Sequence, residues 1–517
     1  MAIRLPRFLA PRERPTREAG DGRLRSWEWP LAALVALLAV LWLGRAPLDT
    51  PYWWDAAAVY VPGSQWVRDH AFAAFPGVFP SLLARGHTTL FYVITAGAFS
   101  LFGDAPAVGH AVVLLFSVMT LVYTYALGTL LFGRLAGAAG ALLAAVAPLY
   151  LTISSMVLPE IPLTALTMAC LYEWARGRHV SAAVFGVLVV LTKETGLACA
   201  CAVLGATALW SWRDRRVRGR ALALGGLAPM VALGAFFVWQ RVAEGWWVLP
   251  FHAELFGQEH DYLWSGVSTF HSMALADGRA IAVFAALLVG GLRLYRDRET
   301  FGPFTPGPGA PPRWAIASAL ALVFLANQVF FTKMWFLERY ALPAHPCLTI
   351  LLAGALLPRV WEEAKAYAAV GLVAVAATAA VAIDRAEAGE GYASGETTFR
   401  YLHMVEAHRE IFRDLEARAE PPLILSTWPI SSELRDPTLG WVERPYEVVG
   451  ITGYLDGTDE VRGDRPIEAI VSAHGIGDHE DLMRVAEELG MRRTRRAVVR
   501  GAVVDLYELS GASPARR

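Results

Sequence analysis

The sequence predicts an all-α, polytopic membrane domain followed by a small soluble α/β domain. The chain of 517 residues is 55% hydrophobic and only 18% charged, whereas a soluble globular protein is roughly 45–50% apolar. Apolar stretches that could span a bilayer, or nearly so, recur until about residue 383. From residue 384 onward the composition changes to a mixed, charged sequence. These observations favour a membrane protein with an extramembrane domain at its C-terminal end.

Charge and cysteine content exclude several function classes. The 46 basic and 47 acidic residues nearly cancel, so no overall field attracts nucleic acid and no nucleic-acid partner is expected. The four cysteines lie in apolar stretches without CxxC spacing. That distribution is typical of small core residues and argues against a zinc site or a disulfide framework.

The segment 1–29 is basic and carries seven arginines before the first apolar stretch. A cleavable signal peptide would need a small-residue cleavage site after that stretch. The residues that follow it, Gly44-Arg45-Ala46-Pro47, form a poor site. We therefore expect the first apolar stretch to be retained as the first span, with segment 1–29 in the cytoplasm.

The segment 30–383 is expected to cross the membrane about eleven times, judged against the usual 17–25 residues per span. A transmembrane domain of this kind buries its polar backbone in helices, because lipid offers no hydrogen-bond partners. The apolar stretches are 30–44, 107–132, 135–151, 161–175, 180–192, 195–211, 221–240, 279–292, 314–331, 343–358 and 366–383.

Arginine and lysine concentrate in alternate loops of this segment, and the positive-inside rule places those loops in the cytoplasm. Arg213 to Arg220 and Arg293 to Arg298 are two such clusters. The stretch 180–211 fits the scheme only if it is divided at Lys193-Glu194. Its first half is then about 20 Å of helix against a hydrocarbon core near 30 Å. Lys193 must therefore lie below the outer headgroups, in a polar cavity or beside a partner.

An odd number of spans places the segment 384–517 on the extracytoplasmic side. It contains strand-like runs and one amphipathic helix, which together predict a small α/β domain. No catalytic motif stands out in it. The runs are 423–426, 497–499 and 502–507, and the helix covers 480–489, closed by Gly490.

The first outer loop, 45–89, is too long for a simple connector and is rich in aromatic residues. Segments of this composition lie in the membrane interface rather than across it. Asp55 follows Tyr52-Trp53-Trp54 directly and precedes three alanines. It is either the N-cap of an interfacial helix, a position that aspartate favours, or a functional carboxylate.

Other outer loops carry few ionisable groups. Glu160 is the sole one in the second outer loop and is either a helix-start residue near the positive dipole end or a site acid. Arg339 in the last outer loop either pairs with Glu338, snorkels to the interface or grips a phosphate. Two carboxylates and the cation Lys193 on adjacent outer loops suit chemistry on a phosphate-bearing substrate at the membrane surface.

The order of these features resembles the GT-C superfamily of polyprenyl-phosphate-sugar glycosyltransferases, in the branch of protein O-mannosyltransferases and lipid A aminoarabinose transferase. The resemblance covers roughly residues 30–360. Two departures are Ala56, where the family often has a second acid, and Thr88-Thr89 in place of two prolines. The resemblance rests on Asp55, Gly86-His87-Thr88-Thr89-Leu90-Phe91-Tyr92, Leu101-Phe102-Gly103, Leu131-Phe132-Gly133-Arg134, Glu160, Leu191-Thr192-Lys193 and Arg339-Tyr340 followed by spaced prolines.

The resemblance implies a GT-C type membrane domain that transfers a sugar from a polyprenyl-phosphate donor, with inversion, on the non-cytoplasmic side. The acceptor would be a lipid, a glycan or a protein, and the enzyme would be a multi-pass protein of the cell inner (plasma) membrane, in contact with membrane lipid. No metal ligands or certain cofactors are implied, although a divalent cation is compatible with the acids. The implied catalytic residues are Asp55 as general base and Glu160, and the implied substrate-binding residues are Lys193, Arg339, Tyr340 and His87.

Two interpretations from other classes stay open on the sequence. A transporter or flippase would use Lys193 and Glu194 as a buried substrate or proton site, and inverted repeats would favour it. A receptor would bind a ligand with its outer tail, but the aromatic first loop then has no evident purpose.

The orientation is tested by cysteine labelling, because arginine asymmetry alone predicts it. In a background without the native cysteines, Ser394→Cys should react with an impermeant reagent applied to intact cells, and Ser26→Cys should react only after permeabilisation. Labelling of Ser26→Cys in intact cells would reverse the orientation.

Overall fold

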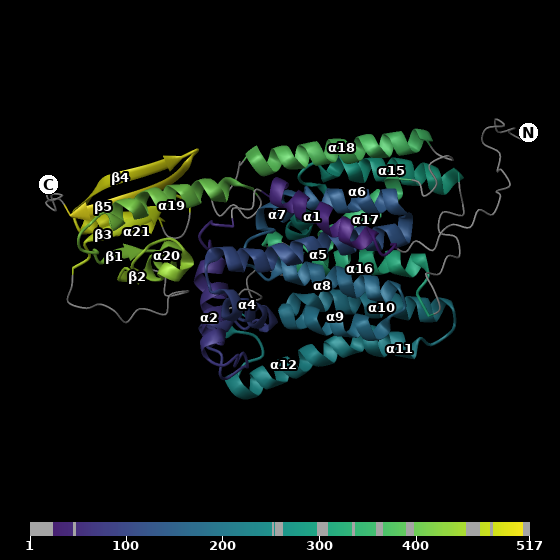
Figure 1. Cartoon of the computed structure of the whole chain (residues 1–517). Coiled ribbons are helices and arrows are strands. Elements are labelled where there is room, and N and C mark those ends of the chain that lie inside the picture. Colours follow the sequence, from purple (N-terminus) through teal and green to yellow (C-terminus); the bar gives the residue numbers. More distant parts are fainter. Residues whose placement is uncertain are drawn as a thin grey trace, which may run out of the picture.

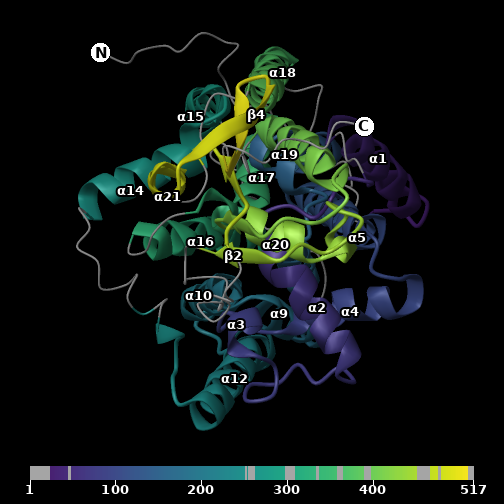
Figure 2. The same cartoon turned by 90° about the vertical axis from the view of Figure 1, so that its left-hand side faces the viewer.

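The computed structural model describes residues 24–44, 48–250, 253, 262–296, 309–332, 337–357, 365–388, 398–450, 466–475 and 479–509. Figure 1 shows a bundle of helices lying side by side, with the C-terminal domain at one end of the bundle next to α2 and α4. Figure 2 views the molecule from that end, so that the C-terminal domain lies in front of the bundle. The domain therefore covers one end of the helices.

Each of the eleven apolar stretches contains a helix, as the sequence predicts. Among the described residues, five helical segments are long and apolar enough to cross a membrane, and a sixth would be a pair of helices bent by 81°. The remaining apolar helices are shorter, so the count of eleven spans stays a prediction. The helices are α1 (Glu28–Leu43), α5 (Pro106–Phe132), α6 (Arg134–Ala145), α8 (Glu160–Ala175), α9 (His179–Thr192), α10 (Leu197–Arg213), α12 (Ala228–Glu244), α15 (Arg279–Arg296), α16 (Arg313–Thr332), α17 (Ala344–Leu356) and α18 (Lys365–Ala388).

Helices α6 and α4 are examples of differences from the expected stretches. The stretch 135–151 is divided into α6 and α7 (Pro148–Ile153), because Ala147 takes a non-helical backbone conformation before a proline. The apolar helix α4 (Leu90–Phe102) follows the first outer loop, where no element was expected. At 13 residues it is about 20 Å long, which is shorter than a bilayer core.

The helix break at Lys193 is confirmed. Helix α9 ends at Thr192, Lys193 has an extended backbone (φ −158°, ψ 140°), and the short η3 (Glu194–Gly196) leads into α10. Lys193 is almost fully buried. The break therefore places a charged side chain inside the bundle, at the end of a helix of only 14 residues.

The first outer loop is folded and largely buried rather than spread along a surface. It forms the π-helix η2 (Ala56–Tyr60), α2 (Val61–Asp69) and α3 (Ser81–Ala84). Most of its aromatic residues belong to the same hydrophobic core as residues of the C-terminal domain. The tail thus supplies an apolar partner that the sequence could not locate, and the expected place of the loop in the membrane interface stays a prediction.

The C-terminal domain is α/β, as predicted. Its sheet has the order β2-β1-β3-β5-β4, with β1 parallel to β2 and β3, and β5 antiparallel to β3 and β4. The predicted strands and helix correspond to β1, β4, β5 and α21, whereas β2 and β3 were not expected. The elements are α19 (Arg400–Glu416), β1 (Ile424–Ser426), α20 (Ile430–Arg435), β2 (Val448–Gly450), β3 (Ala469–Ala473), α21 (His479–Glu488), β4 (Met491–Val499) and β5 (Ala502–Leu509).

The expected domain boundary at residue 384 falls inside α18, which continues to Ala388. The apolar composition ends before the helix does, because Asp384 and the residues after it are polar but compatible with a helix. Helix α19 then packs against β4 and β5. The last apolar helix thus runs toward the domain that covers the bundle end (Figure 1).

Close packing of α5 and α6 provides a test of the fold. A Cβ atom on Gly137 would lie 2.7 Å from the backbone nitrogen of Thr129 and from the carbonyl oxygen of Tyr125. Gly137→Ala should therefore lower the thermal unfolding midpoint of the detergent-purified protein, by overpacking that costs about 1–3 kcal/mol. Gly234→Ala in α12 is the control, since nothing lies within 4 Å of its Cβ position. Equal midpoints for both variants would contradict this packing.

Candidate active site

Asp55 precedes η2 but does not cap it. Its side chain makes no capping hydrogen bond to the helix backbone and instead forms an ion pair with the guanidinium of Arg339. The preceding residue, Trp54, has a left-handed backbone with φ 59°. The N-cap interpretation is therefore wrong, because the carboxylate is directed to a charge on a loop 284 residues away.

Glu160 begins α8 and is completely buried. Its Oε1 atom lies 2.6 Å from the Nζ atom of Lys193 and 3.6 Å from the Nε atom of Arg339. Its Oε2 atom has no hydrogen-bond partner among the described residues. One carboxylate thus holds two cations through a single oxygen, and the other oxygen is left as a buried acceptor.

Arg339 and Tyr340 lie on the short helix η6 (Glu338–Ala341). The Nζ atom of Lys193 lies 3.8 Å from the centroid of the Tyr340 ring, and the guanidinium carbon of Arg339 lies 5.3 Å from it. Glu338 accepts a hydrogen bond from Ser272 at 2.8 Å, whereas Arg339 pairs with Asp55. The expected alternative of an Arg339–Glu338 pair is therefore wrong.

These four charged residues, Asp55, Glu160, Lys193 and Arg339, form what we term the charge cluster. The side chains of Glu160, Lys193 and Arg339 are 0%, 2% and 3% exposed, whereas that of Asp55 is 22% exposed. Two carboxylates balance two cations, so the cluster is neutral as a unit. The cluster is most accessible to solvent at Asp55.

His87 lies apart from the charge cluster but is joined to it through the chain. Its Nδ1 atom is 3.0 Å from the Oε1 atom of Glu194, the residue after Lys193. His87 also lines a cavity between the first outer loop and α12, together with Ser81, Gln240 and Trp246. The structure therefore places His87 beside Glu194 and at this cavity rather than against Asp55.

Sequence reasoning missed Tyr60, which is buried at the charge cluster. Burial raises the pKa of its phenol well above the usual value, and the nearby carboxylates of Glu160 and Asp55 act in the same direction. The hydroxyl is therefore neutral and can act as a hydrogen-bond donor. The signal in the sequence was that Tyr60 follows Asp55 by five residues. This spacing is informative only because residues 56–60 form a π-helix, in which hydrogen bonds join residues five positions apart.

A metal site receives no support within the described ranges. Those residues contain no group of three or more His, Cys, Asp or Glu side chains arranged to hold a metal ion. The two acids of the charge cluster face Lys193 and Arg339 instead. Ala56 stands where a second acid would adjoin Asp55, so the donor set beside Asp55 does not fit a paired-carboxylate site.

Comparison with known proteins identifies related sequences and folds. Residues 86–239 match the family described as dolichyl-phosphate-mannose-protein mannosyltransferase. No curated protein sequence matches the chain significantly. The chain is similar in structure to ArnT from Cupriavidus metallidurans bound to undecaprenyl phosphate, with a TM-score of 0.58, 16% identity, and coverage of 95% of this chain and 100% of that one.

The same protein in its apo state gives a TM-score of 0.56 at 16% identity, covering 93% of this chain and 98% of that one. The similarity therefore includes both the helix bundle and the C-terminal domain. The apolar helices and this shared fold identify a multi-pass membrane protein. The chain thus shares the fold of ArnT over nearly its whole length, and residues 86–239 match the dolichyl-phosphate-mannose-protein mannosyltransferase family model.

Proposed function

We propose that this enzyme transfers a sugar from a polyprenyl-phosphate donor to an acceptor on the non-cytoplasmic side of the inner membrane, with Asp55 as general base. The observation that carries the proposal is the charge cluster, in which groups from four separate segments converge at one end of the bundle. The matched family and the solved structure with undecaprenyl phosphate support a lipid-linked donor.

The donor phosphate would bind to Arg339 and Lys193. The leaving group of this reaction is already a phosphate, so it needs charge stabilisation more than protonation. A planar guanidinium binds phosphate oxygens through paired donors, and such contacts are stronger in a water-poor site than in bulk water. Tyr340 lies under both cations and favours their charged forms through its ring face.

Binding of the phosphate would also free the base. Without donor, the Asp55 carboxylate is occupied by its ion pair with Arg339. A phosphate that recruits the guanidinium of Arg339 would leave that carboxylate available to the acceptor. The acceptor hydroxyl or amine would then lose its proton to Asp55 as it attacks the anomeric carbon. Donor binding would thus precede activation of the acceptor.

Glu160 would organise the cations and the substrate. Its Oε1 atom holds Lys193 and approaches Arg339. The remaining acceptor, Oε2, suits a sugar or acceptor hydroxyl, because a buried acceptor without a partner gains a hydrogen bond when substrate arrives. The acceptor would enter beside Asp55, whose carboxylate is the most exposed of the four. Attack on that side, opposite the phosphate, would invert the anomeric centre.

The transporter interpretation has no comparable support. Lys193 bonds to Glu160, while Glu194 bonds to His87 at 3.0 Å. The two residues that would form one transport site therefore have different partners. His87 would serve the transferase by fixing Glu194, the neighbour of Lys193.

Donor affinity should depend on both cations. Arg339→Ala and Lys193→Ala should each weaken binding of a lipid-phosphate sugar, because loss of a charge-assisted hydrogen bond costs on the order of 1.5–3 kcal/mol. That cost corresponds to about a 10- to 150-fold rise in Kd. The measurement is a binding titration on purified protein that retains the wild-type unfolding midpoint. Lys193→Ala combined with Glu160→Gln serves as a second variant, because it leaves no unpaired buried carboxylate. Unchanged affinity in all three variants would remove these residues from the donor site.

Turnover should depend on the proton-accepting capacity of Asp55. Asparagine keeps the size of the side chain but cannot take a proton at neutral pH. Asp55→Asn should therefore lower turnover by roughly 10²–10⁴ while donor binding survives. Transfer from a radiolabelled lipid donor and a binding titration are measured on one preparation.

The matched control is Asp69→Asn in the same loop, where the carboxylate pairs with Arg68 at the surface. It should keep near-normal turnover. Near-normal transfer by Asp55→Asn would refute the assignment of the base.

A further inference from the structure

The segment directly before Asp55 is bound by the C-terminal domain. The backbone nitrogen of Tyr52 donates a hydrogen bond to the carbonyl oxygen of Leu439 at 3.0 Å. The indole nitrogen of Trp441 donates to the carbonyl oxygen of Tyr52 at 2.7 Å, in a buried position. Two hydrogen bonds therefore fix the backbone three residues before Asp55, although about 390 residues separate the partners in the chain.

The two tryptophans between Tyr52 and Asp55 are enclosed by aromatic rings of the same domain. The Trp53 ring lies 5.2 Å from the imidazole of His408 and 6.0 Å from the indole of Trp441, measured between centroids. The Trp54 ring lies 3.9 Å from that of Trp428 in an edge-on arrangement. These contacts leave the segment little freedom to move without separating it from the domain.

The residues packed against Trp53 make further contacts inside the C-terminal domain. His408 on α19 and Glu433 on α20 are completely buried and lie 2.7 Å apart. Trp441 also packs against the ring of Phe412, at 5.6 Å. Trp53 therefore packs on residues that are themselves buried and in contact with one another inside the domain.

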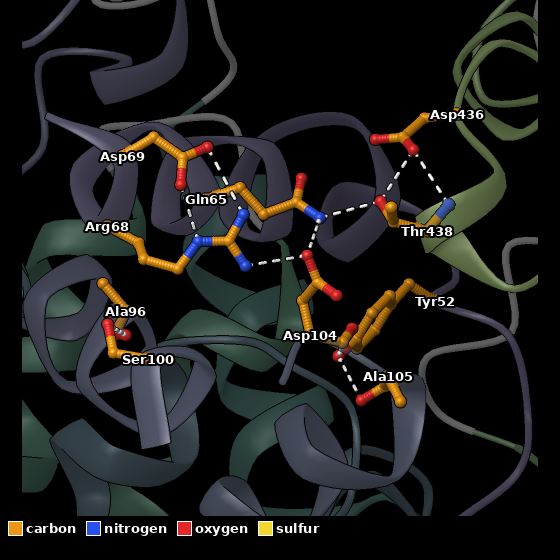
Figure 3. A network of polar contacts seen from close by, with 10 residues as sticks. All are labelled: Tyr52, Gln65, Arg68, Asp69, Ala96, Ser100, Asp104, Ala105, Asp436 and Thr438. Carbon is orange, nitrogen blue, oxygen red and sulfur yellow. Dashed lines mark hydrogen bonds and ion pairs between the residues drawn. The ribbon is translucent and has the colours of Figure 1, made fainter. Parts of the chain in front are cut away.

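A second contact lies after Asp55, on α2, and is shown in Figure 3. The side-chain amide of Gln65 donates to Thr438 at 2.7 Å and to Asp104 at 3.2 Å. Arg68 donates to Asp104 at 2.8 Å. Asp436 accepts from Thr438 at 2.6 Å. The network thus joins α2, the turn before α5 and the C-terminal domain.

Trp54 explains why the segment needs to be held. Its φ of 59° lies in the left-handed region, which a bulky side chain adopts only when its surroundings enforce it. Relaxation of this residue to an ordinary conformation would turn the following peptide and move the Asp55 carboxylate away from Arg339. The ring of Trp428, packed on that of Trp54, is placed to resist this change.

We propose that the C-terminal domain is a positioning element of the transfer site: Trp428 and Trp441 hold residues 52–54 so that the Asp55 carboxylate faces Arg339. This inference rests on the proposed function, in which Asp55 is the base. The contacts of Trp428 and Trp441 with the loop are made to residues 52–54, so their effect on turnover would pass through Asp55.

The experiment uses the full chain in nanodiscs with Trp428→Ala, Trp428→Phe and Trp441→Phe. Trp428→Ala should speed hydrogen exchange at the amides of residues 52–58 by at least about tenfold. It should also lower kcat by about 10- to 100-fold with an unchanged KM for the donor, because misplacement of a reacting group by about 1 Å has effects of that size. Trp428→Phe should restore most of the turnover. Trp441→Phe should act as Trp428→Ala does, more weakly, since it loses only the hydrogen bond to Tyr52.

The matched control is Trp212→Ala, at a tryptophan that is 79% exposed at the end of α10. It should change neither exchange at residues 52–58 nor kcat. A double-mutant cycle separates positioning from a general loss of structure, because Trp428→Ala should cause little further loss of turnover in the Asp55→Asn protein.

Normal exchange at residues 52–58 in Trp428→Ala, a normal kcat, or losses that add to that of Asp55→Asn would each overturn the inference. Failure of the proposed function looks different. If Asp55 is not the base, the Asp55→Asn variant retains turnover. Faster hydrogen exchange at residues 52–58 in Trp428→Ala would still show that the C-terminal domain holds this segment. If Trp428→Ala does not fold, the same criteria apply to Trp441→Phe, which keeps an aromatic ring in place.

Discussion

The pairing of two carboxylates, one of them completely buried, with two buried cations is the constraint on which the rest of the structure depends. Removing a single charge from water costs several kcal/mol even in a relaxed protein, unless a partner and hydrogen bonds compensate. Glu160 and Lys193 are almost wholly buried and lie 2.6 Å apart. Each is tolerable only because the other is present, so the start of α8 and the break between α9 and α10 must meet. The interruption at Lys193 is thus a requirement of the site.

The C-terminal domain extends this constraint to Asp55. The first outer loop is too apolar to be left in water, and its tryptophans find partners in the rings of the domain. Burial of aromatic surface contributes strongly to stability, but by itself it does little to set the orientation of the buried groups. The hydrogen bonds from Trp441 and to Leu439 add direction to it. The contacts that bury this apolar surface are therefore also the contacts that orient the Asp55 carboxylate in the proposed site.

A neutral charge cluster also suits a site that handles charged substrates. A donor phosphate that enters an uncompensated pair of cations would be held tightly before and after reaction. When carboxylates already balance the cations, phosphate binding must replace carboxylate–cation pairs. The net binding free energy is then only the difference between the phosphate–cation and the carboxylate–cation interactions. In the proposed reaction, binding would then be weaker and release of the lipid phosphate easier. Trp54, next to this cluster, has a left-handed backbone conformation, and such a conformation persists only where the surrounding structure holds it.

The sequence by itself determined the helical membrane domain, the break at Lys193-Glu194 and the α/β tail, because each follows from local composition and periodicity. It also singled out Asp55, Glu160, Lys193 and Arg339 as ionisable groups in outer loops. Only the tertiary structure decided that Asp55 meets Arg339, that Trp53 packs against the tail, and that Tyr60 joins the cluster. These contacts join residues as far as about 390 positions apart, and they depend on how rigid helices pack, which no local pattern specifies.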